Sequence, residues 1–281
     1  MNIENTIKDK VFNTIQRYSL FKNAKNILVA VSGGKDSTAA LYFTKRYIYE
    51  NKLNTQIDAI FIDIYEDLKD YHLSILKIIE NICKTLDINL KIISFRDFFK
   101  FSFLEKIGKE KNPCKVCGVL KRYILNKIAR SYDVLVTGHN LDDEAQSIIM
   151  NLINSNISVL ARLGVTSGII SHDKFTKRVK PLYFVLEKEI EQFIKEKRFI
   201  VMKHCPYRKK AYRNEIRILL DTLEKENKHI KLNIVKKYLK IKPKLIERYK
   251  DYKIHLCKLC GEPASGEICK TCQLLKELKE R

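Results

Sequence analysis

Three features that mark particular classes of protein are missing from this 281-residue sequence. No apolar run approaches the length that a membrane-spanning helix needs. The first residues lack the basic and then apolar pattern of a secretory signal. No internal repeat is found apart from paired cysteines. We therefore expect a soluble protein of the cytoplasm that makes no membrane contact.

Acidic residues are scarce relative to basic ones. The chain has 54 Lys and Arg but only 33 Asp and Glu, which gives a formal net charge of +21. This excess favours a nucleic acid partner, because each phosphate that a cation neutralises releases a counterion. A lysine-rich genome is the alternative explanation, and the abundant Ile, Asn and Lys support it. Cations interleaved with aromatic residues suit RNA contacts, and here they are Lys203, Tyr207, Arg208, Lys209, Lys210, Tyr212, Arg213 and Arg217.

The hydrophobic pattern predicts an α/β fold. Hydrophobic residues make up 45% of the chain, enough for a real core. Four short apolar runs are typical of buried parallel strands, and helical patterns alternate with them. Together they predict a doubly wound parallel sheet with helices on both faces and ligands at the carboxyl ends of its strands. The predicted strands are 26–31, 57–62, 90–93 and 134–137, and the predicted helices are 3–22, 38 onward, 68–86, 117–130, 142–153, 187–196 and 212–250.

We expect four parts along the chain. An N-terminal helix occupies 1–25, and the α/β domain follows at 26–200. A basic helical region covers 201–254. A small cysteine-rich module covers 255–281.

A glycine loop links the first predicted strand to a helix that is expected to start at Ser37. Adjacent glycines allow positive φ angles, so that successive N–H groups point into one concavity. Lys35 is suited to neutralising phosphate and Asp36 to holding magnesium. The loop is shorter than the GxxxxGK[ST] phosphate loop. An ordinary glycine turn is the weaker alternative for Ser32, Gly33, Gly34, Lys35, Asp36 and Ser37.

A second polar segment follows the fourth predicted strand. Gly138 permits the close approach of a ligand, and His139 stands beside it. Asp142 and Asp143 fall at a helix start, where one acid is commonly just a cap. The other is expected to handle a metal or a proton, and the residues leave open which of the two it is.

Eight cysteines are present, and a disulfide framework is not expected in a chain of this class. Cys83 and Cys205 are single, and taken alone Cys205 reads as structural. Cys114 and Cys117 precede a helix, which favours their thiolates. Three thiolates can hold an iron–sulfur cluster with one open iron, or a cysteine can carry a persulfide. Four more at C-x-x-C…C-x-x-C spacing predict a closed zinc site, formed by Cys257, Cys260, Cys269 and Cys272.

Together these motifs resemble the PP-loop ATP pyrophosphatases, and more narrowly the tRNA 2-thiouridine synthetases of the TtuA and TtcA type. The resemblance covers roughly residues 26–210 and the tail. It rests on the motifs Ser-Gly-Gly-Lys-Asp-Ser, Pro-Cys-x-x-Cys-Gly-x-x-Lys-Arg, Thr-Gly-His-Asn-x-Asp-Asp-Glu-Ala, Lys-Pro-Leu-Tyr and x-Cys-Pro, which occur in this order. TtuA-type members usually have an N-terminal four-cysteine ribbon, which we expect to be lacking because no cysteine precedes Cys83. TtcA-type members lack both ribbons and use two C-x-x-C pairs for the cluster. This chain has one such pair plus Cys205, so it resembles the TtuA type more.

The resemblance implies a reaction and its residues. ATP is cleaved to AMP and pyrophosphate, a uridine O2 is adenylated, and sulfur replaces it. It implies a [4Fe–4S] cluster on Cys114, Cys117 and Cys205, and catalytic roles for Lys121 and for Asp142 or Asp143. The implied partners are tRNA and a sulfur donor, either sulfide or a ubiquitin-like thiocarboxylate, and family members are commonly dimers. The implied ATP and magnesium site comprises Ala30, Ser32, Gly33, Gly34, Lys35, Asp36, Ser37, Ile62, Asp63, Gly138 and His139.

Two other functions are compatible with parts of the sequence. Another ATP pyrophosphatase, such as an amide ligase or a lysidine-type enzyme, would use the loop but not the three cysteines. A non-enzymatic RNA-binding module would have no use for an intact Lys35, Asp36 and Lys121. The sulfur chemistry is favoured because it uses all of the motifs.

Overall fold

The structure is a computed structural model that describes residues 2–108, 110, 112–168, 173–202, 205–206, 212–249 and 254–279. Its main sheet is made of β1 (Asn26–Val31), β2 (Gln56–Asp63), β3 (Asn89–Ser94), β4 (Val134–Val136), β5 (Thr166–Ser167) and β6 (Lys177–Val179).

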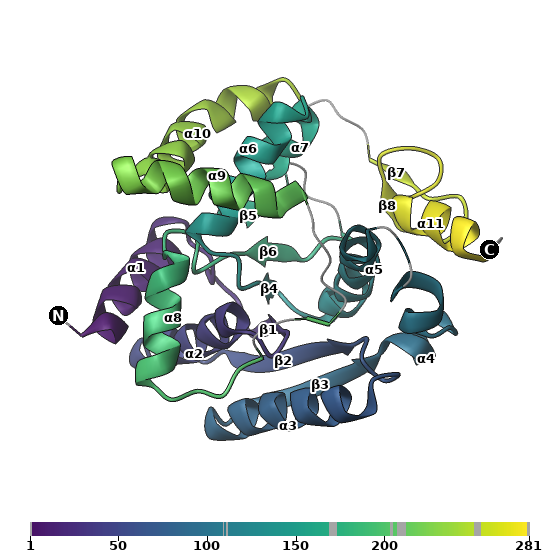
Figure 1. Cartoon of the computed structure of the whole chain (residues 1–281), viewed down its shortest axis with the longest axis horizontal. Coiled ribbons are helices and arrows are strands. Elements are labelled where there is room, and N and C mark those ends of the chain that lie inside the picture. Colours follow the sequence, from purple (N-terminus) through teal and green to yellow (C-terminus); the bar gives the residue numbers. More distant parts are fainter. Residues whose placement is uncertain are drawn as a thin grey trace.

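The order of the strands is β3-β2-β1-β4-β6-β5 (Figure 1). β5 pairs antiparallel with β6, and the other pairings are parallel. The predicted doubly wound sheet is confirmed, and β5 and β6 are strands that the apolar runs did not predict. The order reverses between β1 and β4, whose carboxyl ends therefore flank a crevice suited to a ligand.

Helices cover both faces of the sheet. Ile27 and Val29 of β1 join the main core, whereas Leu28 packs in a smaller core with Leu135 of β4 and Ala129. Alternate residues thus point to opposite faces, as expected for a doubly covered strand. The helices of this part are α1 (Ile3–Arg17), α2 (Lys35–Glu50), α3 (Lys69–Thr85), α4 (Phe95–Phe99), α5 (Pro113–Ile128) and α8 (Glu187–Glu196), with short turns η1 (Leu104–Gly108) and η2 (Ala129–Ser131).

Two helices begin earlier than predicted. α2 starts at Lys35 after the N-cap residue Gly34. α5 starts at Pro113, a residue favoured at the first helical position, and the Asn112 side chain accepts a hydrogen bond from Lys115 N at 3.2 Å. The loop lysine and both cysteines of the first C-x-x-C pair therefore lie in the opening turns of helices, near their positive ends.

The basic region predicted as helical over 212–250 is two helices, α9 (Tyr212–Glu226) and α10 (Ile230–Glu247). Asn227 interrupts it, because its Oδ1 accepts a hydrogen bond from His229 N at 3.1 Å. Both helices pack with α6 (Leu141–Ile153), and α10 also packs with α7 (Ile157–Arg162) (Figure 1).

The C-terminal module contains β7 (His255–Leu256), β8 (Pro263–Ala264) and α11 (Lys270–Lys279) and lies against α5 (Figure 1). Lys174 Nζ donates to Gly261 O at 2.6 Å, and Arg130 pairs with Glu262. These contacts anchor the module to the α/β domain. Among the described helices, none has the length and apolarity that a membrane span requires.

Candidate active site

The glycine loop turns tightly between β1 and α2. Gly33 has a φ of +74°, and a Cβ there would lie 3.1 Å from Cγ1 of Ile75. Gly34 instead has a φ of −89°. Ser37 Oγ accepts a hydrogen bond from Ser32 N at 3.1 Å and donates one to Gly34 O at 2.9 Å. Gly33 alone of the two glycines has the expected positive φ, and the loop directs the first turn of α2 toward the crevice.

Gly138 brings the loop after β4 against the loop after β1. A Cβ on Gly138 would lie 2.8 Å from the carbonyl carbon and oxygen of Asp36 and 2.9 Å from the nitrogen of Ser37. Backbone atoms at the start of a helix have little room to move away. Gly138 is thus in close contact with the first turn of α2. A side chain at position 138 would push this turn away from the loop after β4 and widen the crevice.

A cleft of about 290 Å³ lies at the carboxyl ends of β1, β2 and β4. Small-molecule sites are typically roughly 300–1,000 Å³, so the cleft is of a size for a nucleoside. Its sequence-predicted lining residues are Ala30, Ser32, Asp36, Ser37, Ile62, Lys121, Gly138, His139 and Asp143. Its other lining residues are Val31, Ile60, Leu125, Thr137 and Arg213. Gly33, Gly34, Lys35 and Asp63, which were also predicted for the nucleotide, do not line the cleft.

Lys35 and Asp63 are engaged by neighbouring side chains. Lys35 Nζ lies 2.6 Å from Oε1 of Glu187, the first residue of α8. Asp63 is buried, accepts a hydrogen bond from Tyr65 N at 2.9 Å, and lies 2.8 Å from Nδ1 of His72. Asp63 therefore fixes the turn after β2, and Lys35 would have to exchange Glu187 for a phosphate.

The neighbouring acids Asp142 and Asp143 point in different directions. Asp142 is buried, with its Oδ1 2.6 Å from Lys231 Nζ and its Oδ2 accepting a hydrogen bond from Glu187 N at 2.7 Å. Asp143 lines the cleft and closes a capping box with Asn140 at the start of α6. Asp142 thus ties α6 to α8 and α10, whereas Asp143 faces the ligand space.

Asp36 and Asp143 form an acidic pair in the cleft. Asn140 Nδ2 donates to Asp36 Oδ1 at 3.0 Å, and Arg213 Nη1 lies 3.6 Å from Asp143 Oδ1. Burial raises the pKa of both carboxyls above the usual range. The charge of Asp143 raises the pKa of Asp36 further, against the opposing charge of Lys35. The raised pKa values mean that the surroundings of Asp36 and Asp143 do not fully compensate two negative charges. A divalent cation such as magnesium, which prefers oxygen ligands, would compensate them.

The imidazole of His139 stands among cations in the cleft. Its Nδ1 lies 3.0 Å from Thr137 Oγ1. Desolvation by the surrounding protein, reinforced by positive charges, lowers the pKa of His139 far below the usual range for histidine. A neutral imidazole can stack or form hydrogen bonds in the cleft without adding charge. The contributing cations, from the largest effect to the smallest, are Lys180, Arg213, Arg178 and Arg122.

The structure brings Cys205 to the beginning of α5, where Cys114 and Cys117 lie. Tyr65 Oη donates a hydrogen bond to Cys205 Sγ at 3.5 Å. Cys114 is exposed, and Cys117 and Cys205 are half-buried. Burial raises the pKa of the Cys117 thiol, the charge of Lys121 opposes this rise, and the other two thiols add to it. The three predicted thiols are therefore close enough to influence one another's ionisation.

Lys121 connects this group of thiols to the cleft. It lines the cleft, and its Nζ lies 5.9 Å from the centre of the Tyr65 ring, whose hydroxyl contacts Cys205. Its charge lowers the pKa of both Cys117 and Asp63. One ammonium group is thus within electrostatic reach of both a nucleotide and a sulfur atom.

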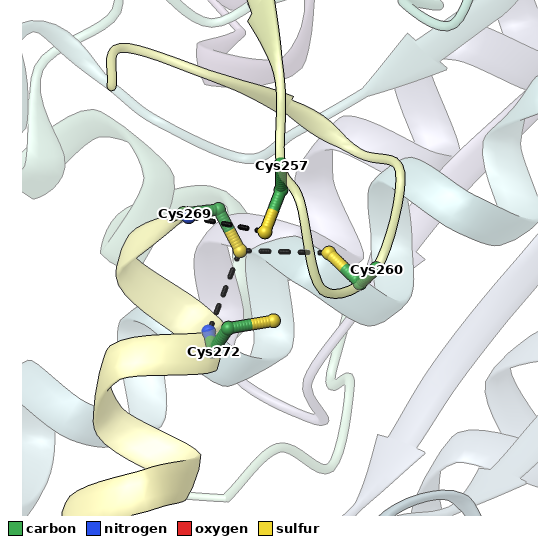
Figure 2. A group of neighbouring side chains, drawn as sticks. All are labelled: Cys257, Cys260, Cys269 and Cys272. Atoms are coloured by element: carbon green, nitrogen blue, oxygen red, sulfur yellow. Dashed lines mark hydrogen bonds between the residues drawn. The ribbon is translucent and has the colours of Figure 1, made fainter. Parts of the chain in front are cut away.

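The four C-terminal cysteines converge between the end of β7 and the start of α11 (Figure 2). The Sγ atoms of Cys260 and Cys269 lie 3.6 Å apart, and all four sulfurs lie within 4.8 Å of one another. Sulfurs bound to a tetrahedral zinc at about 2.3 Å would be roughly 3.8 Å apart. The spacing fits a single tetrahedral metal ion.

Within the described part of the chain, these four are the only cysteine, histidine and acidic residues that gather this closely. Cys114, Cys117 and Cys205 do not gather this closely. A four-iron cluster binds each cysteine through a different iron, which spaces the sulfurs more widely, and three cysteines leave one iron without a protein ligand. The looser set of three fits that requirement.

Sequence reasoning missed Tyr65, Glu187 and Arg213 as parts of the site. Tyr65 follows the end of β2 by two residues, a position that the strand-end argument could have included. Arg213 lay in the basic stretch assigned to RNA, but it contacts Asp143 and donates to Ser147 Oγ at 2.5 Å. Of the other residues in that stretch, Lys203, Tyr207, Arg208, Lys209 and Lys210 lie outside the described residues.

Comparisons with known proteins agree with this geometry. The sequence pattern of the PP-loop domain family matches residues 3–223. The chain is 34% identical over 274 residues to the tRNA-5-methyluridine(54) 2-sulfurtransferase of Pyrococcus horikoshii, covering 96% of this chain and 85% of the relative. It is 30% identical over 278 residues to cytoplasmic tRNA 2-thiolation protein 1 of Aspergillus niger, covering 96% and 80%.

A solved structure is similar over nearly the whole chain. The U34-tRNA thiolase NcsA of Methanococcus maripaludis, solved with its [4Fe–4S] cluster, superposes with a TM-score of 0.81. The two sequences are 34% identical, and the match covers 99% of this chain and 90% of that one.

Proposed function

The chain belongs to the PP-loop family and, within it, to the tRNA 2-thiolation sulfurtransferases, and on that premise we propose that it uses ATP to replace O2 of a tRNA uridine with sulfur. One observation carries the proposal: Lys121 lies between a nucleotide-sized cleft and three thiols at one edge of the sheet. A ligase would need the cleft alone and would leave the three cysteines without a role.

The cleft would bind ATP with its phosphates over the glycine loop. The N–H groups at the start of α2 and the Ser32 and Ser37 hydroxyls provide donors for phosphate oxygens. Lys35 would leave Glu187, 2.6 Å away, and pair with phosphate. Asp36 and Asp143 would hold magnesium, which would offset the burial and repulsion that raise their pKa values.

In the first chemical step the uridine O2 attacks the α-phosphorus of ATP. The bond from that phosphorus to the bridging oxygen of the β-phosphate breaks, and pyrophosphate leaves. Negative charge that develops on the α-phosphate would be stabilised by the helix N-terminus and by Lys121, which lines the cleft. Asp142 has no direct part, because its oxygens are bound to Lys231 and to the backbone of Glu187.

In the second step sulfide attacks C2 of the adenylated base, the C2–O2 bond breaks, and AMP leaves with the oxygen. Cys114, Cys117 and Cys205 would hold a [4Fe–4S] cluster, which supplies an open iron for sulfide. Lys121 would stay paired with the departing AMP phosphate. A persulfide on one cysteine is the alternative sulfur source, and it would need a second thiol to release the product.

The C-terminal module would hold zinc through Cys257, Cys260, Cys269 and Cys272, which fit a closed tetrahedral site. Its position against α5 puts it on the same side of the sheet as the thiols, where it would contact tRNA. We propose a cytoplasmic location from the name of the Aspergillus relative. Sulfide or a ubiquitin-like thiocarboxylate would donate the sulfur.

The test is mass spectrometry of tRNA nucleosides after an anaerobic reaction with iron-loaded protein, ATP, magnesium and sulfide, with pyrophosphate measured in parallel. Wild type should form a 2-thiouridine derivative and about one pyrophosphate per sulfur. Cys205→Ala should abolish the thiolated nucleoside. Cys83→Ala is the matched control, because Cys83 is buried on α3 away from the site. Pyrophosphate release without any thiolated nucleoside in the wild type would refute the proposal.

A further inference from the structure

Arg178 of β6 is a charged residue in an interior position. In the sheet it pairs in register with Leu135, whose side chain packs in the small core under α5. Residues side by side in neighbouring strands point to the same face, so Arg178 points toward α5. Its Nη2 donates to Asn126 Oδ1 at 2.6 Å, and its Nε is buried without a hydrogen-bond partner.

Arg122 lies one helical turn before Asn126 on the same side of α5. It folds back over Gly118, where a Cβ would lie 3.4 Å from Arg122 Nη1. Burial lowers the pKa of both guanidinium groups, and for Arg178 the neighbouring charge of Arg122 lowers it further, to about 10. The two side chains therefore form a cationic pair near Asn126 of α5.

No carboxylate of the described residues lies within ion-pair distance of either arginine, whereas several other arginines of the chain are paired. Arg46, for example, pairs with both Glu4 and Glu50. Arg178 is half-buried and Arg122 is exposed beside it. A half-buried cation without a counter-ion is costly, and a neighbouring like charge adds repulsion. Within the described part of the chain, Arg178 Nε lacks a hydrogen-bond acceptor, and the two guanidinium groups lack a counter-ion. Both needs would be met by a bound anion.

The position of the pair indicates which anion. Arg122 directly follows Lys121, which lines the cleft, and comes five residues after Cys117 on the same helix, so it lies near both the thiols and the cleft. Neither arginine lines the cleft. The phosphates of ATP already have the glycine loop and Lys35, on the α2 side of Gly138. A second phosphate at this point is one that arrives with the base to be modified.

We propose that Arg122 and Arg178 form a binding site for a backbone phosphate of the RNA, next to the nucleotide whose base enters the cleft. The assignment rests on the proposed function. Arginine suits it because its planar fork can hold two phosphate oxygens at once. RNA bases that proteins recognise are commonly splayed out of single-stranded loops. The phosphates on either side of such a base are then accessible to basic side chains.

The experiment measures binding of unmodified tRNA over a salt series, with ATP binding and melting temperature measured on the same samples. Arg122→Gln and Arg178→Gln should each weaken tRNA binding by roughly tenfold and reduce the slope of log K against log salt by about 1. Arg122→Lys and Arg178→Lys should keep the slope but lose part of the affinity, since lysine lacks the fork. ATP binding should stay unchanged in all four variants.

Arg46→Gln is the control, because it removes an arginine whose partners are Glu4 and Glu50. It should leave the salt slope unchanged. The melting temperature of the Arg122 variants should not fall, because no ion pair is lost. The Arg178 variants lose only the hydrogen bond to Asn126, so their melting temperature should fall slightly at most. An unchanged slope in both Gln variants would overturn the inference, and weaker ATP binding with an unchanged slope would assign the pair to ATP. If wild type binds tRNA with the full slope but does not thiolate it, the proposed function fails and the phosphate site stands.

Discussion

The two cysteine sites of this chain share a motif but differ in how they are assembled. In each, a lysine ammonium lies over a tyrosine ring whose hydroxyl bonds a cysteine. Lys121 lies 5.9 Å from the ring of Tyr65, which contacts Cys205. Lys127 lies 5.1 Å from the ring of Tyr123, which contacts Cys260.

The sulfurs of the C-terminal site come from one short segment and lie within 4.8 Å of one another. Burial acts to raise the pKa of the Cys257 thiol, but backbone N–H groups of Cys269, Cys260 and Leu259 lower it to about 6. At the other site burial prevails and raises the pKa of Cys117. The local segment thus favours the Cys257 thiolate, although burial raises the pKa of its neighbours Cys269 and Cys272. The clear difference between the sites is spacing, because the thiols at the sheet edge lie farther apart than those of the C-terminal module.

The largest expected effect is on metal content, because a cysteine variant at either site should lose the metal of that site and keep the other. Cys205→Ala should lose iron and all thiolation while it retains about one zinc per chain. Cys269→Ala should lose zinc and retain iron, because the two sites share no ligand. Elemental analysis after anaerobic reconstitution measures both metals. Loss of both metals in either variant would show that the sites depend on each other.

Lys121→Met should lower the thiolation rate by about 10²–10⁴-fold, the range for removing a group that stabilises charge or transfers protons in a transition state. Iron content and tRNA affinity should stay the same. Lys127→Met is the matched control, since it removes the corresponding lysine at the zinc site. Equal losses in single-turnover rate for the two variants would contradict the special position of Lys121.

Asp143→Asn should reduce activity by about 10–100-fold at fixed magnesium and raise the magnesium requirement. The raised pKa values of Asp36 and Asp143 mean that both take up protons at a higher pH than usual, so wild-type activity falls as the pH is lowered through that range. Removing the charge of Asp143 should move this acid limb to lower pH. A pH–rate profile at several magnesium concentrations measures it.

Asp142→Asn tests whether the acid next to Asp143 has a structural role and no catalytic one. It should leave the acid limb in place but destabilise the fold by about 1–3 kcal/mol, because Lys231 loses one of three carboxylate partners in a buried position. Urea unfolding gives the difference. An acid limb that moves in this variant would make Asp142 the chemical acid instead.

The smallest effect is expected for Tyr65→Phe. Loss of the hydrogen bond to Cys205 should lower the reduction potential of the iron-loaded protein, because that bond stabilises the more negative reduced state, and should slow thiolation by about two- to tenfold. Tyr123→Phe should leave the potential unchanged. Redox titration followed by electron paramagnetic resonance compares the two, and identical potentials in both variants and wild type would remove Tyr65 from the site.

Motifs of consecutive residues were predictable from the sequence because their geometry is local. The four-cysteine spacing and the glycine loop are examples. So are the strand ends, which were predicted at 31, 62 and 137 and are found at 31, 63 and 136. Short edge strands such as β6 were missed, because three residues carry little hydrophobic pattern. The starts of α2 and α5 were misplaced, although Pro113 is a recognisable signal for the first helical position.

By itself the sequence determined the PP-loop family, the parallel sheet and the four-cysteine group, because each depends on residue types at fixed spacing along the chain. Only the tertiary structure separated Asp143 in the cleft from Asp142 on Lys231 and left Arg122 and Arg178 without a carboxylate partner among the described residues. It also brought Cys205, which the family resemblance had grouped with Cys117, to the start of α5. Those outcomes depend on which side of a helix or strand meets a distant segment, and packing of the whole chain decides that.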